Sequence, residues 1–548
     1  MEMVDFKQEE FIEEQIEQMS LEELVGQLLN FHISVCKTPE EFECMVRRVR
    51  PGGIFIGYAD KEKIRQYTDI ANRYTRVPVI VSADVEYGPG CVLKDETYLP
   101  SPMAWGACDD EELIWRAGKA TGEVCRKNGI HWSFAPIVDI NYNKDNPITN
   151  TRAVSDQPEQ VAKIAGAYAK GMQENGMMIA GCKHFPGDGM DDRNQHYCTT
   201  INSLSKEEWM NTYGYVYKEM FEMGAASVMV GHIALPAVEE EIDPILGPKP
   251  GTLSYNIMTK LLKEELGFQG CVLSDAMCMV GASVMCPPEK QSISFIKAGG
   301  DMLLFPLERD FDYLLEAVKS GELPLERVKD AVRRILGMKM RARLFEDQEK
   351  LAKEIEVSED LRAISAEIAE KCITVIRNSQ NLIPLSIRKG GKFLLIHLQR
   401  NRDDMGVPAY MNDIGTLEEE LKKRGYEVDT MSGYAMDHHK LEKIKGEYDC
   451  ILINSRIDPQ NYLGGSLRIN GDNIMSFWRG VVVDHPCVIF TSFGDPYKLY
   501  ELPFLRTYVN AYGSGKETLR AFVSVLLGEK TVVGKSPVAL KGFFNCQV

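Results

Sequence analysis

The sequence predicts an α/β protein, a (β/α)₈ TIM-like barrel followed by a smaller α/β sandwich domain. Short apolar runs alternate with helix-like stretches over the first 310 residues, eight such runs occur there, and polar residues follow several of them directly. Apolar strands separated by helices are typical of a parallel sheet covered on both faces, and eight such units match a barrel. The eight expected strands are 27–31, 53–57, 77–83, 131–137, 178–183, 225–231, 270–274 and 302–305.

Helical patterns lie between these runs and continue beyond them. Residues 310–370 are charged, with Leu and Ile at helical spacing, which indicates a closing helix and a linker. We therefore predict a barrel over 1–345, a helical linker over 346–370 and a sandwich domain over 371–548. The expected barrel helices are 111–128, 158–174, 206–223 and 254–266; in the sandwich we expect strands at 392–397, 450–454 and 487–491 and helices at 416–423 and 514–527.

Composition and charge narrow the class of partner and the compartment. The net charge of −17 argues against nucleic acid and anionic membranes, which reward clustered Lys and Arg. The 14 cysteines include no CxxC pair, which favours reduced, buried thiols over a disulfide framework. The acidic amphipathic N-terminus lacks the features of a signal peptide, and no apolar run reaches the length of about 18 residues that a membrane span needs. We expect a cytoplasmic protein.

Polar side chains follow five of the expected strands. In a (β/α)₈ barrel the carboxyl ends of the strands carry the active site, so these side chains should converge on one pocket. His232 is a candidate pocket residue, with a packed strand-end histidine as the equal alternative. The residues are Asp84 and Glu86 after the third strand, Asp139 after the fourth, Lys183 and His184 at the fifth, His232 after the sixth and Asp275 after the seventh.

Two segments are the strongest candidates for chemistry. Residues 181–198 end a strand and continue into a Gly- and Pro-rich loop that is dense in titratable groups. Such loops on a rigid scaffold carry function more often than most loops, although a solvated polar loop is the alternative. Residues 266–281 place Asp275 at the end of an apolar strand, where a carboxylate is a nucleophile, a metal ligand or a helix N-cap.

Together these segments resemble glycoside hydrolase family 3, and within it the β-N-acetylglucosaminidase branch. KHFPGDG at 183–189 and LGFQGCVLSDA at 266–276 carry the resemblance, supported by residues 134–152, 250–254 and 298–304. The resemblance spans the whole chain and implies that Asp275 is the nucleophile of a retaining enzyme. Asp188 stands where the branch usually has His. The implied substrate-binding residues are Asp84, Arg152, Lys183, His184 and Asp188.

The acid/base departs from the pattern of that branch. The resemblance implies an Asp-x-His pair on the loop after the fifth strand, and this chain has Asn194-Gln195-His196. Histidine suits the role because its ordinary pKa of about 6.5 lies near working pH. Asn194 can orient the ring but supplies no charge, which in comparable triads costs several orders of magnitude. A natural variant, an impaired protein and an introduced substitution stay open, and Asp191 or Asp192 could orient the ring instead.

A second departure concerns the substrate. The resemblance implies a Gly-Gly pair and an Arg after the third strand, but residues 84–94 read DVEYGPGCVLK, with Tyr87 at the first Gly position and no Arg. This argues against recycling of cell-wall muropeptides and leaves the terminal sugar site intact. A terminal β-linked N-acetylhexosamine is the expected substrate, with a β-glucoside or an unacetylated amino sugar as alternatives.

The predicted function is exo-glycosidase action by double displacement through a glycosyl-enzyme on Asp275, with His196 as acid/base and Asn194 as its partner. The first alternative is a phosphorylase, because a neutral histidine does not repel phosphate. The second is an impaired sugar-binding protein. No His, Cys or carboxylate spacing indicates a metal, and we expect no cofactor. A carbohydrate is the expected partner, without nucleic acid or membrane, and a homodimer is the assembly we consider.

Overall fold

A computed structural model describes residues 6–240, 242–283, 285–399, 413–432, 438–456, 468–469 and 484–543. The chain divides into two compact units. Unit 1 comprises Met1–Thr97, Ile114–Ile140 and Val161–Asp360; unit 2 comprises Tyr98–Leu113, Asn141–Gln160 and Leu361–Val548. Two segments inside the barrel sequence therefore pack with the C-terminal part of the chain. The domain borders expected at 345 and 370 stay a prediction.

Unit 1 contains a parallel β-barrel, so the predicted fold class is confirmed. Within the described residues its sheet has eight strands in the order β10-β1-β2-β3-β4-β5-β7-β9, and a parallel bridge between Leu273 and Met302 joins the last strand to the first. Every expected apolar run of the barrel overlaps one of these strands. They are β1 (Leu29–His32), β2 (Gly53–Phe55), β3 (Ile80–Ala83), β4 (Trp132–Ser133), β5 (Ile179–Phe185), β7 (Ser227–Val230), β9 (Cys271–Ser274) and β10 (Leu303–Leu304).

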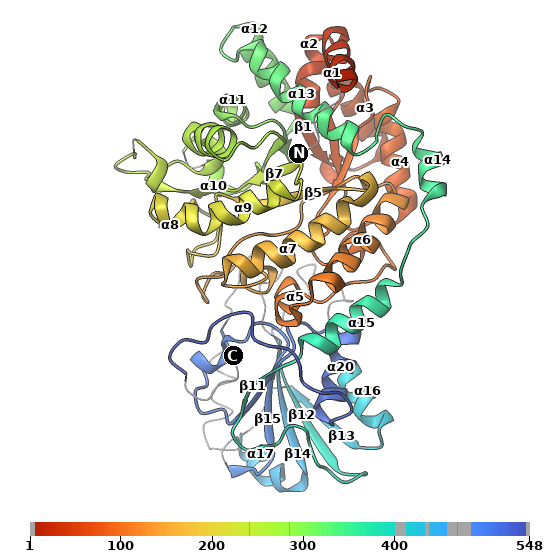
Figure 1. Cartoon of the computed structure of the whole chain (residues 1–548), viewed down its shortest axis with the longest axis vertical. Coiled ribbons are helices and arrows are strands. Elements are labelled where there is room, and N and C mark those ends of the chain that lie inside the picture. Colours follow the sequence, from red (N-terminus) through yellow and green to blue (C-terminus); the bar gives the residue numbers. More distant parts are fainter. Residues whose placement is uncertain are drawn as a thin grey trace. The chain divides into compact units, whose positions relative to one another are not determined.

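Helices surround this barrel in Figure 1. Several begin at the polar residues that favour helix starts: Ser20 and Ser205 form capping boxes, and Asp60 accepts a backbone N–H. The helix expected over 206–223 is interrupted at Thr212, which has non-helical backbone angles. These helices are α1 (Phe6–Gln18), α2 (Leu21–Gln27), α3 (Pro39–Val49), α4 (Lys61–Asn72), α6 (Glu111–Lys127), α7 (Pro158–Gln173), α8 (Lys206–Asn211), α9 (Tyr213–Glu222), the π-helix η7 (Asn256–Glu265), α10 (Val280–Ser283), α11 (Pro288–Ala298), α12 (Glu308–Lys319), α13 (Leu325–Arg341) and α14 (Gln348–Glu354).

A short ribbon on unit 1 supports the loop after β5. Strand β6 (Thr200–Ile201) pairs in parallel with β8 (Ile233–Ala234), which follows β7. The loop is also held by α9, because the Tyr213 hydroxyl donates to the Asp188 carbonyl over 2.6 Å. At Gly187, with a φ of 119°, a Cβ would lie 2.1 Å from the Tyr213 ring, so glycine is required for this contact. The titratable loop thus rests on a rigid base.

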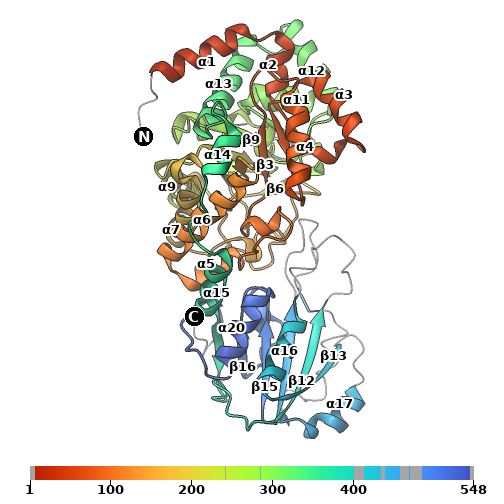
Figure 2. The ribbon, with the colours of Figure 1, turned by 90° about the vertical axis from the view of Figure 1, so that its right-hand side faces the viewer.

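Unit 2 holds the predicted second α/β domain (Figure 2). In its described part the sheet order is β11-β16-β15-β14-β12-β13, with β11 antiparallel to β16 and the other pairs parallel. Strands β12, β14 and β15 coincide with the expected runs, and β11, β13 and β16 were not predicted. The strands are β11 (Thr374–Asn378), β12 (Lys392–Gln399), β13 (Glu427–Ser432), β14 (Cys450–Arg456), β15 (Val488–Ser492) and β16 (Thr507–Asn510).

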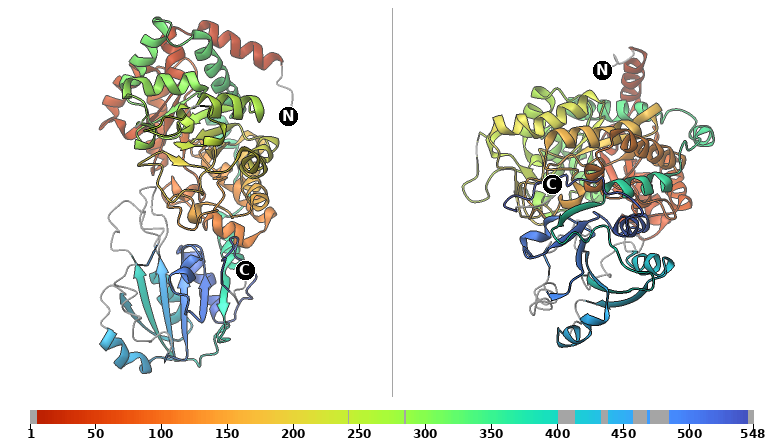
Figure 3. Two further views of the ribbon diagram at one scale, coloured as in Figure 1. Left: turned by 90° about the vertical axis from the view of Figure 1, so that its left-hand side faces the viewer. Right: turned by 60° about the horizontal axis from the view of Figure 1, so that its bottom comes forward.

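The helices of unit 2 pack against this sheet, as the two views of Figure 3 show. Helix α15 contacts both α5 and α20, and α16 contacts α20. The segment around α5 therefore belongs to this unit although it precedes most of the barrel in sequence. No helix among the described residues is both long and apolar enough to cross a membrane. The helices are α5 (Pro102–Cys108), α15 (Leu361–Cys372), α16 (Gly415–Lys423), α17 (His438–Ile444) and α20 (Lys516–Leu526).

Candidate active site

Asp275 lies at the carboxyl end of β9 and is only 9% exposed. Its backbone N–H donates to the Val230 carbonyl over 2.8 Å, and one carboxylate oxygen accepts the Ala276 N–H over 2.7 Å. Burial on its own would raise the pKa of this carboxyl group, but the nearby histidines His184, His232 and His196 outweigh it, so the pKa is lowered. Asp275 is therefore an anion at neutral pH, as a carboxylate nucleophile must be.

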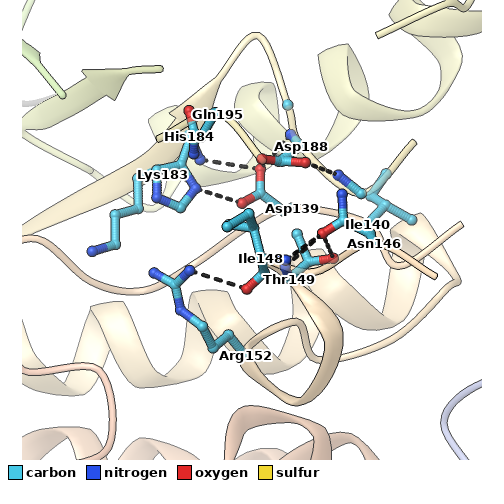
Figure 4. A network of polar contacts seen from close by, with 12 residues as sticks. Asp139, Ile140, Asn146, Ile148, Thr149, Arg152, Lys183, His184, Asp188 and Gln195 are labelled. Atoms are coloured by element: carbon cyan, nitrogen blue, oxygen red, sulfur yellow. Dashed lines mark hydrogen bonds and ion pairs between the residues drawn. The ribbon is translucent and has the colours of Figure 1, made fainter. Parts of the chain in front are cut away.

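Asp139 organises the residues that end β5 (Figure 4). One carboxylate oxygen accepts the backbone N–H groups of His184 and Asp188 over 3.1 and 2.8 Å, and the other lies 2.7 Å from Nδ1 of the His184 ring. Since a carboxylate only accepts, Nδ1 of His184 carries the hydrogen. Asp139 is fully buried, so it acts through His184 and the loop.

Lys183 is held between two carboxylates. Its Nζ lies 2.8 Å from Asp84 Oδ1 and 2.6 Å from Glu86 Oε1. The Lys183 and Glu86 side chains are 3% and 2% exposed, whereas that of Asp84 is 28% exposed. A buried ammonium with two carboxylate partners remains charged, and Asp84 is the more accessible of those partners.

Asp188 and His232 are more buried than pocket-lining residues usually are. Asp188 Oδ1 accepts the N–H of Gly189 over 2.7 Å, so part of its carboxylate faces its own loop. The His232 ring is buried, with Nε2 3.1 Å from the Ala276 carbonyl and Nδ1 2.9 Å from the Thr252 hydroxyl. A carbonyl only accepts, so Nε2 of His232 carries the hydrogen and Nδ1 accepts from Thr252. Burial lowers the pKa of His232, which favours this neutral form.

Asn194 and His196 form the pair that the sequence suggested. Asn194 Oδ1 accepts the backbone N–H of His196 over 2.9 Å and lies 2.7 Å from Nδ1 of the same ring. Because a backbone N–H can bond only to the amide oxygen, the amide orientation is settled, and Nδ1 of His196 carries the hydrogen. The exchangeable position of the ring is therefore Nε2.

The two other carboxylates of this loop do not replace Asn194. Asp191 accepts bonds from the Arg193 backbone and guanidinium, and its Oδ2 also accepts the Ile201 N–H over 2.8 Å. These bonds lower the pKa of Asp191 against the effect of burial. Asp192 is exposed. Asn194 therefore makes the contact with the His196 ring that the resemblance assigns to an Asp.

Arg152 belongs to unit 2, on the short helix η3 (Asn150–Arg152). It is buried, and its guanidinium donates to the Ile148 carbonyl over 3.1 Å (Figure 4). Asn146 shapes the same turn, because its Oδ1 accepts the N–H groups of Ile148 and Thr149, each over 2.8 Å. The loop is built to hold Arg152 in one orientation.

A model of the glycosyl hydrolase family 3 N-terminal domain matches residues 12–338. The chain belongs to glycoside hydrolase family 3. This confirms the predicted family, and with it a glycoside hydrolase. Within the described residues of this family 3 protein, no group of three or more His, Cys, Asp or Glu side chains could hold a metal ion.

Three similar proteins match this chain over almost its whole length. A β-N-acetylglucosaminidase/β-glucosidase of Cellulomonas fimi is 29% identical over 95% of this chain and 94% of its own length. A solved family 3 β-N-acetylglucosaminidase from Paenibacillus sp. is 25% identical, with a TM-score of 0.81 over 96% of this chain and all of that one. A solved β-glucoside phosphorylase, BglX, is 29% identical, with a TM-score of 0.86 over 99% of this chain and 98% of that one.

Sequence reasoning placed Glu86 at the barrel mouth but gave it no role, whereas the structure pairs it with Lys183. The signal was its position two residues after Asp84, since alternate residues of an extended segment point to the same side. Asp139, which the sequence places after the fourth strand, contacts His184 and the N–H of Asp188. The contacts of Gln195 with His232 and of Thr199 with Gly281 had no signal in the sequence.

Proposed function

We propose that this family 3 protein releases terminal β-linked N-acetylhexosamine, or a related β-glycoside, with retention of configuration. In this proposal Asp275 is the nucleophile, His196 the acid/base and Asn194 its orienting partner. One observation carries it: the segment that follows the buried Asp275 is bonded to the loop of His196, because the Val280 N–H donates to the His196 carbonyl over 3.0 Å. Against the effect of burial, His184, His232 and His196 lower the pKa of Asp275. An anionic carboxylate beside a titratable ring is the minimum set for double displacement.

In the first step a carboxylate oxygen of Asp275 bonds to the anomeric carbon as the bond to the leaving oxygen breaks. The His196 imidazolium gives its Nε2 proton to that oxygen, because Nδ1 donates to Asn194 Oδ1. In the second step Nε2 takes a proton from water, the water oxygen bonds to the anomeric carbon, and the Asp275 carboxylate is released. The ring returns to its starting charge.

We assign the terminal sugar to the charged groups around β3 and β5. Asp84 and the Lys183 ammonium would bind sugar hydroxyl groups by charge-assisted hydrogen bonds, and His184 would add its Nε2 because Nδ1 is engaged by Asp139. Asp188 and His232 remain in the proposed site, with His232 acting through the Ala276 backbone. Arg152 keeps the substrate-binding role that the resemblance implies.

The substituent at C2 of the terminal sugar is the choice that this proposal leaves open. The Cellulomonas fimi relative is named for both N-acetylglucosaminide and glucoside substrates, and this chain matches it over nearly its whole length. We therefore propose N-acetylhexosamine first and glucose second. Nitrophenyl β-glycosides of N-acetylglucosamine, N-acetylgalactosamine, glucosamine and glucose, compared by kcat/KM, will rank them.

The mechanism is tested by trapping the intermediate. A 5-fluoro glycosyl fluoride of the preferred sugar, which keeps the substituent at C2, should add one fluorosugar to the protein, and peptide mass spectrometry should place it on Asp275. The Asp275→Asn variant should not be labelled. Asp192→Asn, an exposed change in the neighbouring loop, is the control and should label normally. Labelling elsewhere, or turnover with inversion of configuration, would overturn the proposal.

Phosphate is the second candidate acceptor, and two observations favour it. The acid/base pair carries no carboxylate, since Asn194 contacts His196 and Asp191 is bonded to Arg193 and Ile201. A phosphate anion approaching the anomeric carbon would therefore not meet a like charge at the acid/base. The solved β-glucoside phosphorylase also matches almost the whole chain. Phosphate oxygen would bond to the anomeric carbon, releasing Asp275 and a sugar 1-phosphate.

The two acceptors are separated by one assay. Turnover of the preferred aryl glycoside is measured with and without inorganic phosphate, and the products are identified by phosphorus NMR. A rise in rate with a sugar 1-phosphate as the main product supports phosphorolysis. An unchanged rate with free sugar as the product leaves hydrolysis as the function.

A further inference from the structure

The loop that carries His196 is bonded directly to the segment that follows Asp275. The Val280 N–H donates to the His196 carbonyl over 3.0 Å, and the Thr199 hydroxyl donates to the Gly281 carbonyl over 3.0 Å. Val280 and Gly281 begin α10, five and six residues after Asp275. The two proposed catalytic groups thus lie on segments that hold each other through backbone atoms.

Gln195 lies inside this contact, between Asn194 and His196 in sequence. It is only 1% exposed, and its Oε1 accepts the backbone N–H of His232 over 3.2 Å. Figure 4 draws Gln195 beside His184. A backbone N–H can bond only to the amide oxygen, so the bond to His232 fixes which way the Gln195 amide points. Among the described residues its buried Nε2 has no hydrogen-bond partner, so the bond from His232 is the one that holds the amide.

Two glycines make room for Gln195. A Cβ at Gly231 would lie 2.9 Å from Gln195 Oε1, and a Cβ at Gly281 would lie 2.4 Å from the Gln195 carbonyl oxygen. Contacts below 3.0 Å are essentially never seen for real Cβ atoms. Any other residue at either position would displace Gln195, so its placement depends on both glycines.

The strand segment that receives Gln195 also holds the nucleophile. Val230 accepts the Asp275 N–H over 2.8 Å, and the His232 ring bonds to the Ala276 carbonyl over 3.1 Å. Residues 230–232 therefore fix the backbone on both sides of the Asp275 side chain. Through Gln195 the same three residues also fix the loop of His196.

We propose that Gln195 is a positioning residue that sets the place of His196 relative to Asp275. This rests on the proposed function, in which His196 protonates the leaving oxygen. Proton transfer requires hydrogen-bond reach, so a small displacement of the ring weakens acid catalysis more than it weakens attack by Asp275. Loss of the Gln195 bond should therefore matter most for substrates whose leaving group needs protonation.

The test uses aryl β-glycosides with leaving groups from dinitrophenol to phenol. Gln195→Met keeps the length of the side chain and removes the oxygen that accepts from His232. We expect its kcat/KM for the dinitrophenyl substrate to stay within about threefold of wild type and that for the phenyl substrate to fall by about tenfold or more, since acid catalysis contributes about 10²–10⁴-fold. The exposed Gln269→Met is the matched control and should change neither.

Two further variants make each outcome decisive. His196→Ala should show the same dependence on leaving group in stronger form; if it does not, the proposed role of His196 fails, and this inference with it. If His196→Ala shows the dependence and Gln195→Met loses both substrates equally or neither, only the role of Gln195 is overturned. Should Gln195→Met not fold, Gln195→Leu, which also removes the oxygen that accepts from His232, takes its place and must show the same selective loss.

Discussion

The two ends of the barrel bury charge in different ways. At the amino end of the strands, Asp301 is fully buried and bonded to Lys263, Arg327 and the Val272 N–H. At the carboxyl end, the pKa of the buried Asp275 is lowered by His184, His232 and His196. Lys263 and Arg327 share the Asp301 carboxylate in fixed ion pairs, whereas histidine is the residue type that exchanges a proton near working pH. The difference teaches that one end is built for stability and the other for chemistry.

The largest expected effect is a loss of activity at the carboxyl end of the barrel without a loss of stability. Asp275→Ala should lower kcat by at least about 10⁴-fold, because removing a nucleophile typically costs that much or more. The melting temperature should change little, since the carboxylate is buried at an energetic cost. Activity on the preferred aryl glycoside and thermal unfolding of the same preparation check this. A variant that retained a tenth of wild-type activity would contradict the assignment.

The next effect is a loss of stability at the amino end of the barrel without a loss of activity. Asp301→Ala leaves Lys263 and Arg327 partly buried without their carboxylate, and breaking a buried pair in this way costs about 3–5 kcal/mol. Urea unfolding should show this loss, while kcat per folded molecule, measured well below the melting temperature, stays near that of wild type. If kcat falls as far as stability does, the two ends are not separable.

Asn194→Asp adds a negative charge beside His196 at the carboxyl end of the barrel and tests how far activity depends on that charge. A carboxylate on Nδ1 of His196 would stabilise the imidazolium, and the reverse change in a serine protease triad costs about 10⁴-fold. We expect hydrolysis of poorly activated aryl glycosides to rise by about 10²-fold, and turnover with phosphate to fall relative to it. Asp192→Asn serves as the loop control. Unchanged hydrolysis would show that the missing charge does not limit this chain.

The smallest expected effect lies at the amino end, where burial lowers the pKa of Lys339 to about 7. Its Nζ bonds to Gln27 Oε1 over 2.8 Å. Above pH 7 the folded protein loses this proton while the unfolded chain keeps it to about pH 10.4, so wild-type stability rises with pH in that window. Relative to wild type, Lys339→Met should therefore lose about 2 kcal/mol of unfolding free energy between pH 7 and pH 9.

Urea unfolding at the two pH values measures this difference. Lys350→Met, at an exposed position, is the matched control and should show no such dependence. A pH-independent difference between Lys339→Met and wild type would mean that Lys339 stays charged in the folded protein.

The sequence predicted the barrel well because each of its strands is an apolar run between helices. It predicted less of unit 2. Strand β13 lies at the edge of the sheet and most of its residues are at least partly exposed, so no apolar run marks it. Strand β16 has only four residues, and β11 pairs with it antiparallel through a bulge. Short and edge strands depend on the neighbours they pair with, which local sequence does not show.

In the candidate site, too, the features set by local sequence could be predicted and those set by distant contacts could not. Residues at or just after the carboxyl ends of strands, such as Asp275 and Lys183, could be placed at the barrel mouth from the sequence. The roles of Glu86 and Gln195 could not, because they depend on contacts with residues 97 and 37 positions away. The position of His232 at the barrel mouth could be predicted, but the hydrogen bond between its ring and Thr252 could not.

The hydrogen bond between Asn194 and His196 has an evolutionary consequence. Asparagine and aspartate differ by one heavy atom in the side chain and by one nucleotide in the codon. Oδ1, which accepts both bonds from His196, is present in either residue. A gene that encodes Asn194 is therefore one point mutation from a carboxylate beside His196. Under the proposed mechanism, the choice of acceptor molecule becomes a trait that selection can reverse.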